Sequence, residues 1–259
     1  MSVVAVLVAM EAELVHLRNL ATSSSPRSIA HWEAYDLSLG DHTVVAVKSG
    51  IGMLNAAAAA ERTMCEINPD IMLNYGCAGA HRRDIMPGDV IIGAQTVNHA
   101  ALNILPDGSE VHNDRGNLNS GEQIFPAVID ADAVLLAKAT EVAAGISFAP
   151  WPADVVWPKS IPHRAPEVFV GPLASSEIWT QNLDRLDVLH ARHQSLSEDN
   201  ESGAFAHVAF IHDVPFLSVK DIANNEYFAS SDLAEFSDFP TGEVGKRAAS
   251  LIAALIKAL

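Results

Sequence analysis

Two short stretches of the sequence place carboxylate side chains where they can do chemistry on a ligand. MEAEL (10–14) carries two glutamates directly after the apolar run VVAVLVAM (3–10), and SEDNESGA (197–204) carries a cluster of acids before the helical stretch GAFAHVAFIHDV (203–214). Carboxylates act as general bases and accept hydrogen bonds from hydroxyl groups. Because ligands of open α/β sheets bind at the carboxyl ends of strands, we expect both stretches to border a ligand crevice.

Other candidate binding segments also follow strand-like runs. They are SGIGMLN (49–55), GCAGA (76–80), NHAALN (98–103) and KDIANNEYF (220–228). Small residues let backbone N–H groups approach a ligand closely, but any strand-to-helix connection also needs a tight turn. The glycines of SGIG and GCAGA are compatible with both interpretations.

The elements that must position these segments are read from hydrophobic patterns. Apolar runs without alternation are typical of strands buried on both faces. Such runs occupy 3–10, 42–50, 70–80, 89–97 and 215–223. Helical patterns occupy 53–67, 131–145, 203–214 and the C-terminus, where Val244, Ala248, Leu251, Ile252, Leu255 and Ile256 share one face. This alternation predicts an α/β fold with a mixed, largely parallel central sheet flanked by helices.

Two remaining segments are predicted to be irregular. Residues 101–125 are polar and rich in Asn, Gly and Asp, which is typical of a loop. Residues 150–166 contain five prolines and two tryptophans and are expected to cross the surface without regular structure. Because no repeat or linker divides the chain, we expect a single domain over residues 1–259.

Composition excludes several classes of function. The 259 residues carry a formal charge of −16, which disfavours binding to nucleic acid or to anionic membranes. No apolar run is long enough to span a membrane, and MSVVAVLVAMEAE is read as a strand and not as a signal peptide. Two cysteines indicate a reducing, cytoplasmic location. The eleven histidines show no HxxxH, HExxH or CxxC spacing, so we expect neither a metal nor a cofactor.

The order of the motifs is more specific than any one of them. AMEAEL, SGIG, a Gly-x-Ala-Gly turn, PGD, and an acid before GAFAHV that is followed by VPF stand in sequence along the chain. This pattern resembles the nucleosidases for 5′-methylthioadenosine and S-adenosylhomocysteine, within the nucleoside phosphorylase superfamily. The resemblance covers residues 3–100 and 168–259, whereas residues 101–167 match poorly. It implies a nucleoside phosphorylase-like fold, a purine nucleoside as the small-molecule partner, cleavage of the bond between purine and ribose, and a homodimer.

On the side of the attacking water, the resemblance gives Glu13 the role of the glutamate that activates water. Two nearby carboxylates repel phosphate, so MEAEL favours water as the nucleophile. For Glu11 we favour a structural role, as a first-turn acid that complements the helix dipole.

On the ribose side, the resemblance assigns Glu201 to the ribose hydroxyls, and Asn200 stands where the family commonly has methionine. Glu198 is interpreted as a solvated acid at a helix start. Trp179 matches an aromatic position that lies against the purine, although a tryptophan there can equally belong to the core. The other substrate-binding residues implied are Ile51, Cys77, Ala78, Gly79 and Phe228.

The residues that differ from the family pattern are mainly those expected to contact the departing purine base. Asn224 replaces an aspartate that binds N7 of the base, and asparagine donates hydrogen bonds but is no acid. Asp221 or Glu226 would take its place if the strand end were shifted. In the wider superfamily an asparagine here often accompanies 6-oxopurines. Lys220 replaces an arginine, which keeps the charge and loses the planar fork. Cys77 replaces a small hydroxyl residue and is expected to be a buried side chain, not a nucleophile.

Three functions remain compatible with these residues. The leading hypothesis is a purine nucleosidase with Glu13, Asn224 and Lys220 as its catalytic residues. The second is a phosphate-dependent phosphorylase, for which His81, Arg82 and Arg83 form the only nearby basic cluster. The third is a nucleoside-binding protein without activity, which Asn224 favours and the retained glutamates disfavour.

Overall fold

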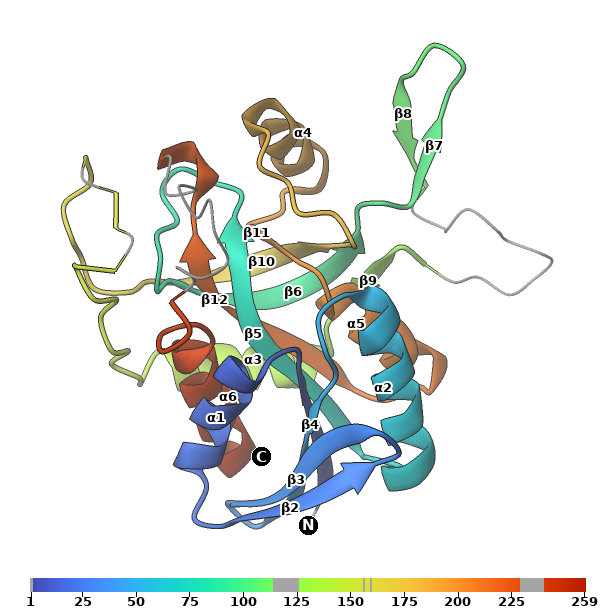
Figure 1. Ribbon diagram of the computed structural model, residues 1–259, viewed down its shortest axis with the longest axis vertical. Coiled ribbons are helices and arrows are strands. Elements are labelled where there is room, and N and C mark those ends of the chain that lie inside the picture. Colours follow the sequence, from blue (N-terminus) through green and yellow to red (C-terminus); the bar gives the residue numbers. More distant parts are fainter. Residues whose placement is uncertain (1, 114–125, 156, 159, 229–239) are drawn as a thin grey trace.

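The computed structural model describes residues 2–113, 126–155, 157–158, 160–228 and 240–259 (Figure 1). The strands are β1 (Val3–Val8), β2 (Ser24–Ile29), β3 (Trp32–Leu39), β4 (His42–Lys48), β5 (Ile71–Ala80), β6 (Val90–Asn98), β7 (Leu102–Ile104), β8 (Glu110–His112), β9 (Val128–Asp130), β10 (Val168–Ser175), β11 (Ser197–Asp199) and β12 (Phe216–Asn224). The helices are α1 (Glu11–Leu20), α2 (Met53–Ile67), α3 (Ala133–Ala143), α4 (Leu183–His193), α5 (Ser202–Ile211), α6 (Lys246–Ala258) and the 3₁₀ turn η1 (Glu226–Phe228).

The large sheet has the strand order β11-β10-β6-β12-β5-β1-β4-β3-β2. Strands β4, β1, β5 and β12 run parallel to one another, whereas β6 is antiparallel to β12 and parallel to β10. β11 pairs with β10 and also, antiparallel, with β5. The sheet therefore curls back on itself, and this brings the carboxyl ends of β5 and β12 close to β11.

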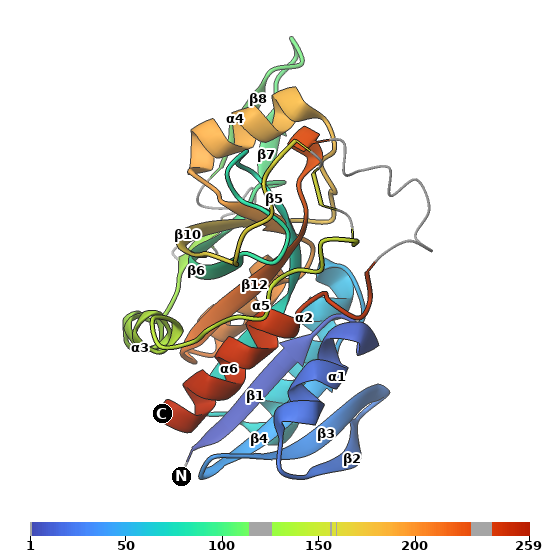
Figure 2. The same cartoon turned by 90° about the vertical axis from the view of Figure 1, so that its left-hand side faces the viewer.

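Helices cover both faces of this sheet. Leu14 and Leu17 of α1 share a buried cluster with α3, α6 and the strands on one face, and Figure 2 shows α1 and α6 side by side there. On the other face α2 and α5 form a second cluster around Phe205 and Met72. The arrangement confirms the predicted α/β fold with a mixed sheet between helices. None of the helices that the described residues form combines the length and apolar character needed to cross a bilayer.

The elements differ from the sequence predictions in specific places. The strands and helices expected from apolar patterns are present within a few residues of their predicted ends. The loop predicted at 101–125 is wrong in part, because β7 and β8 pair as a hairpin there, while residues 114–125 lie outside the described part of the chain. The described residues of 150–166 form no helix or strand, as predicted. β2, β3 and α4 were not predicted; β2 is almost wholly exposed, so it carries no apolar run.

Phe205 is the natural test of the packing between α5 and α2. It is fully buried, whereas Phe210 on the same helix is 48% exposed. We predict that Phe205→Ala lowers the free energy of unfolding by about 3–5 kcal/mol, because it leaves a cavity under the sheet. The matched variant Phe210→Ala is expected to stay within about 0.5 kcal/mol of the unsubstituted protein. Denaturant unfolding measures both, and equal losses would contradict this description of the core.

Candidate active site

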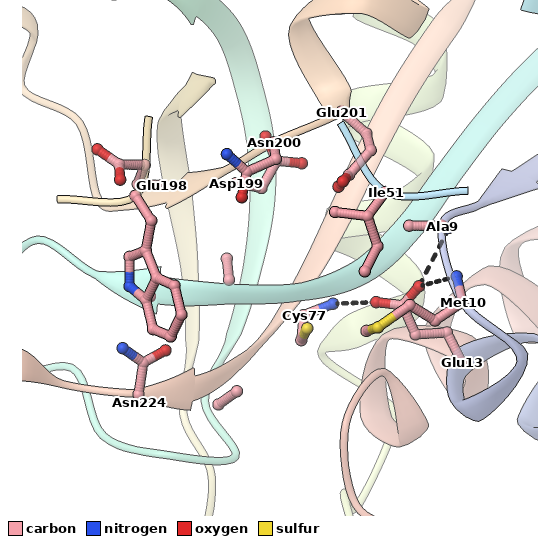
Figure 3. A pocket seen from close by; sticks show the side chains of 14 residues that line it. Ala9, Met10, Glu13, Ile51, Cys77, Glu198, Asp199, Asn200, Glu201 and Asn224 are labelled. Atoms are coloured by element: carbon pink, nitrogen blue, oxygen red, sulfur yellow. Dashed lines mark hydrogen bonds between the residues drawn. The ribbon is translucent and has the colours of Figure 1, made fainter. Parts of the chain in front are cut away.

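A cavity of about 180 Å³ lies where β1, β5 and β12 end, beside the segments that follow β10 and β11. Nine of the eleven residues selected from the sequence line it: Glu13, Ile51, Cys77, Ala78, Gly79, Trp179, Asn200, Glu201 and Asn224. Lys220 lies behind the wall of the cavity, and Phe228 lies on η1 outside the lining. In Figure 3, Glu13, Ile51 and Glu201 stand at one end, with Glu198 and Asn224 at the other.

Glu13 is held by backbone N–H groups. As the third residue of α1, it reaches back so that Oε2 accepts from the N–H groups of Ala9 and Met10, both at 3.1 Å. Oε1 accepts from the N–H of Cys77 at 2.8 Å. The carboxylate therefore caps its own helix and is also tied to β5, which fixes its position at the cavity wall.

Gly76 of β5 lies directly against the carboxylate of Glu13. A Cβ on Gly76 would lie 2.6 Å from Oε1, so only glycine fits at this position of β5. Burial raises the pKa of the Glu13 carboxyl, and the charge of Lys220 with the N–H groups of Cys77 and Met10 opposes part of that rise. A carboxylate with a raised pKa is a stronger base than a solvated one, which suits the activation of water.

Glu201 faces the same cavity from the start of α5. Its Oε1 accepts a hydrogen bond from the N–H of Gly52 at 2.9 Å, and Glu201 is only 7% exposed. Burial, followed by repulsion from Asp199, raises the pKa of Glu201 to about 7. Within the part of the chain that the structure describes, no N–H or O–H group donates to Oε2, which leaves this oxygen for hydroxyl groups in the cavity.

Lys220 supplies the positive charge behind these acids. It is 1% exposed on β12, and its Nζ lies 2.6 Å from Oδ2 of Asp199. Burial lowers the pKa of this lysine, but Asp199, Glu201 and Glu13 together outweigh that effect and raise it. Lys220 is not among the described residues that line the cavity, and the direct catalytic role expected from the sequence stays a prediction.

Cys77, which we expected to be a buried side chain and not a nucleophile, is partly buried on β5. Its thiol is half-buried, and burial together with the charge of Glu13 raises its pKa well above the usual range. The thiolate, which is the reactive form of cysteine, is therefore suppressed.

Asn224 lies at the end of the cavity away from Glu13, and Trp179 also lines the cavity. Trp179 is 48% exposed and lines the cavity, so the alternative that it belongs to the core is wrong. Asn224 is the last residue of β12, and it is this residue that lines the cavity, not Asp221 or Glu226. Asp221 is fully buried and bonded to the N–H of Arg247, and Glu226 lies outside the lining, so neither carboxyl faces the cavity directly.

The prediction that Glu198 is a solvated acid at a helix start is wrong. It is 8% exposed and accepts from the N–H of Thr180 at 2.7 Å and from its hydroxyl at 2.8 Å. Nε2 of His81 and Nε2 of His99 lie 3.5 and 3.4 Å from its Oε2. Although burial acts against it, these groups lower the pKa of Glu198. The carboxylate thereby anchors the residue that follows Trp179.

The basic cluster considered as a phosphate site, His81, Arg82 and Arg83, already has partners within the protein. Arg82 pairs with Asp84, and Arg83 lies 3.6 Å from Asp187. His81 is buried, with its Nδ1 2.8 Å from the hydroxyl of Ser195. Among the described residues that line the cavity, none is Lys, Arg or His. Over the same described residues, no cluster of His, Cys, Asp and Glu is arranged to hold a metal ion.

Five lining residues were not selected from the sequence: Ala9, Met10, Glu198, Asp199 and Ala223. Met10 and Asp199 lie inside the stretches MEAEL and SEDNESGA. The sequence therefore indicated the segments that border the cavity, but not these individual residues. Only the pairing of β11 with β5 and β10 shows which acids of SEDNESGA turn inward.

Comparison with known families agrees with this fold. The model of the phosphorylase superfamily matches residues 3–259, and the chain belongs to that superfamily. Within it, the chain is 27% identical over 222 residues to the 5′-methylthioadenosine/S-adenosylhomocysteine nucleosidase of Staphylococcus aureus (strain bovine RF122 / ET3-1), covering 84% of this chain and 86% of that protein. The resemblance inferred from the motifs is therefore confirmed.

Two solved structures share the fold over the whole chain. The nucleosidase of the same name from Neisseria meningitidis, in complex with methylthio-immucillin-A, has a TM-score of 0.78 at 23% identity and covers 100% of both chains. The futalosine hydrolase of Helicobacter pylori strain 26695 has a TM-score of 0.78 at 16% identity and covers 100% of this chain and 98% of that one. At these identities the likeness establishes the fold.

The buried carboxyl of Glu201 predicts a pH-dependent effect on stability. Between pH 4.5 and about 7 the carboxyl is ionised in the unfolded chain but protonated in the folded one, so folding is increasingly disfavoured as pH rises. Glutamine mimics the protonated form. Glu201→Gln should therefore gain on the order of 1–3 kcal/mol in unfolding free energy, relative to the unsubstituted protein, between pH 4.5 and pH 7.

Denaturant unfolding at several pH values across this range measures that difference. The control Glu141→Gln should change the free energy of unfolding little, since the side chain of Glu141 is 72% exposed on the surface. A pH-independent difference for Glu201→Gln would show that the carboxyl titrates alike in both states.

Proposed function

We propose that the protein hydrolyses the N-glycosidic bond between a purine and its ribose, with water as the nucleophile. The observation that carries this proposal is a cavity whose lining has buried carboxylates and, within the described residues, no cationic side chain. Such a lining suits a neutral nucleoside and a water molecule, and it repels phosphate. The first candidates for the substrate are nucleosides like those in the names of the relatives, 5′-methylthioadenosine and S-adenosylhomocysteine.

Glu13 is the proposed general base. Three backbone N–H groups fix its carboxylate at one end of the cavity, and its raised pKa favours removal of a proton from water. As water attacks the anomeric carbon, one of its protons passes to Glu13, the C–N bond breaks, and its electron pair leaves with the purine nitrogen, which takes a proton from solvent to give the free base. The fixed position of the carboxylate avoids reorganisation at the moment of reaction.

Glu201 is the proposed ligand of the ribose hydroxyls. It stands at the same end of the cavity as Glu13, and Oε1 is already bonded to the N–H of Gly52. The remaining oxygen accepts from a hydroxyl, and the carboxylate stabilises positive charge that develops on the sugar ring as the bond breaks. Asn200, Ile51 and Ala78 complete the wall around the sugar, and Gly79 lies against the carboxamide of Asn224.

Trp179 and Asn224 are proposed to hold the purine. The exposed ring of Trp179 offers a stacking surface, and Asn224 offers a carboxamide to the edge of the base. Lys220 acts from behind the wall, by holding Asp199 and thereby the turn that carries Glu201.

The alternatives fit the structure less well. Phosphorolysis requires an anion site, but Arg82 and Arg83 are paired with acids and His81 is buried. Binding without catalysis gives no reason for fixing a buried carboxylate of raised pKa in the cavity wall. Hydrolysis accounts for both observations.

Glu13→Gln tests the proposed base. We predict that purified protein releases free base from a purine nucleoside in phosphate-free buffer, and that this substitution lowers kcat by about 10²- to 10⁴-fold. The neighbouring variant Glu11→Gln is the matched control, because Glu11 faces solvent and pairs with Arg18 and Lys48. Its turnover should remain near that of the unsubstituted enzyme.

The panel for this assay contains adenosine, inosine, 5′-methylthioadenosine and S-adenosylhomocysteine, with free base followed by chromatography. Release only after phosphate is added would move the protein to the phosphorylases. Equal losses in the two variants would remove the specific role of Glu13.

We further propose that the enzyme works in the cytoplasm as a homodimer. The two cysteines form no disulfide, which fits a reducing compartment. Ile51 is 50% exposed at the cavity and Leu54, three residues later, is 82% exposed. Such apolar side chains beside a cavity suit the approach of a second subunit that closes it.

A further inference from the structure

The first turn of α1, which carries Glu13, is also held by a side chain from the neighbouring strand β5. The hydroxyl of Tyr75 donates to the main-chain oxygen of Glu13 at 2.8 Å. Tyr75 is fully buried, so this bond satisfies a hydroxyl that is shielded from solvent. Tyr75 immediately precedes Gly76 and Cys77, which contact the carboxylate itself. Three consecutive residues of β5 therefore hold Glu13 by both its main chain and its side chain.

The start of α6 contacts Glu13 as well. Gly245 is the N-cap of α6 and has a φ of 72°, a left-handed conformation that favours glycine. A Cβ built on Gly245 would lie 3.1 Å from Cγ and 3.3 Å from Cβ of Glu13. Figure 2 shows α1 and α6 side by side, which brings these two residues together although they are far apart in sequence. Glycine at 245 thus leaves the space that the Glu13 side chain occupies.

A buried ion pair keeps the start of α6 in this place. Oδ2 of Asp221, on β12, accepts the N–H of Arg247 at 2.7 Å and lies 3.6 Å from Nη1 of the same arginine. Asp221 and Arg247 are 0% and 1% exposed. Moving α6 away from Glu13 would separate these two buried charges, which is strongly unfavourable. The contact between Gly245 and Glu13 is therefore fixed from the side of β12.

We propose that Tyr75 and Gly245 are positioning residues for the general base, which hold the first turn of α1 so that the Glu13 carboxylate stays within reach of the attacking water. The inference rests on the proposed function, because it takes Glu13 as the base. Neither residue is among the described residues that line the cavity, so both act through Glu13. A misplacement of about 1 Å can lower the rate of a reaction about 100-fold, so support of this kind matters for catalysis.

Gly245→Ala is the first test. The added methyl group and the strained backbone should displace the Glu13 side chain and lengthen its bonds from the N–H groups of Met10 and Cys77. We predict that kcat falls about 10- to 100-fold while KM stays within about twofold, because the cavity lining is unchanged. Those N–H groups oppose the effect of burial on the pKa of Glu13. The acid limb of the kcat/KM profile should therefore move to higher pH.

Gly40→Ala is the matched control. Gly40 also has a positive φ, of 61°, and a Cβ there would lie 3.3 Å from Cα of Lys257, near the end of α6. The substitution imposes the same kind of strain against the same helix, at a place without contact to Glu13. The control should lose stability but keep the kcat and the pH profile of the unsubstituted enzyme.

Tyr75→Phe is the second test, and it keeps the inference testable if Gly245→Ala does not fold. It removes the hydroxyl bonded to Glu13 and retains the ring. We expect kcat to fall about tenfold, with the acid limb again moving to higher pH. Its control is Tyr35→Phe, which removes a hydroxyl bonded to Oε1 of Glu33 at 2.5 Å and should change neither quantity.

Carbon-13 NMR of the carboxyl groups measures the titration of Glu13 without turnover, with Glu13→Gln used to assign its signal. The pKa of Glu13 should be higher in Gly245→Ala and Tyr75→Phe than in the unsubstituted protein. If this holds for protein that releases no base from any nucleoside, the positioning is supported and the hydrolysis is rejected. Two results would overturn the inference: a Glu13 titration that neither substitution raises, or an equal rise in the controls Gly40→Ala and Tyr35→Phe.

Discussion

The buried ion pair between Lys220 and Asp199 is the constraint on which the site depends. The two side chains are 1% and 2% exposed, and their charged atoms lie 2.6 Å apart. Removing two charges from water is expensive, so such a pair persists only where the geometry is good and the remaining lone pairs are bonded. Both oxygens of Asp199 also accept from Ser202, at the start of α5, so the pair fixes the turn that presents Glu201.

The buried cation Lys220 interacts with three buried acids, so negative charge exceeds positive charge around the cavity. The charge of Lys220 does not make the cavity electropositive, because the carboxyl groups of Asp199, Glu201 and Glu13 interact with it. The acids that remain uncompensated have raised pKa values, which makes them bases and hydrogen-bonding partners for neutral groups. The site is thus adapted to water and hydroxyl groups, while an anionic nucleophile would add charge where negative charge already exceeds positive.

Sequence patterns predicted the parts of the molecule that depend on local chemistry. Strands buried on both faces read as continuous apolar runs, and Glu13 followed such a run at a strand end. β2 was not predicted because an exposed edge strand needs no run of apolar residues. The burial of Glu198 depends on Thr180, His81 and His99, which are distant in sequence. The contact of Gly245 with Glu13 likewise depends on the packing of α6 beside α1, which no residue type reveals.

The central claim is that water attacks the sugar in a cavity that excludes phosphate. It is tested most directly by phosphorus NMR of the reaction carried out in buffer that contains inorganic phosphate. The account predicts that the base is released with free sugar as its only partner product and that no sugar phosphate signal develops. A growing signal of a sugar 1-phosphate, in step with release of the base, would contradict it.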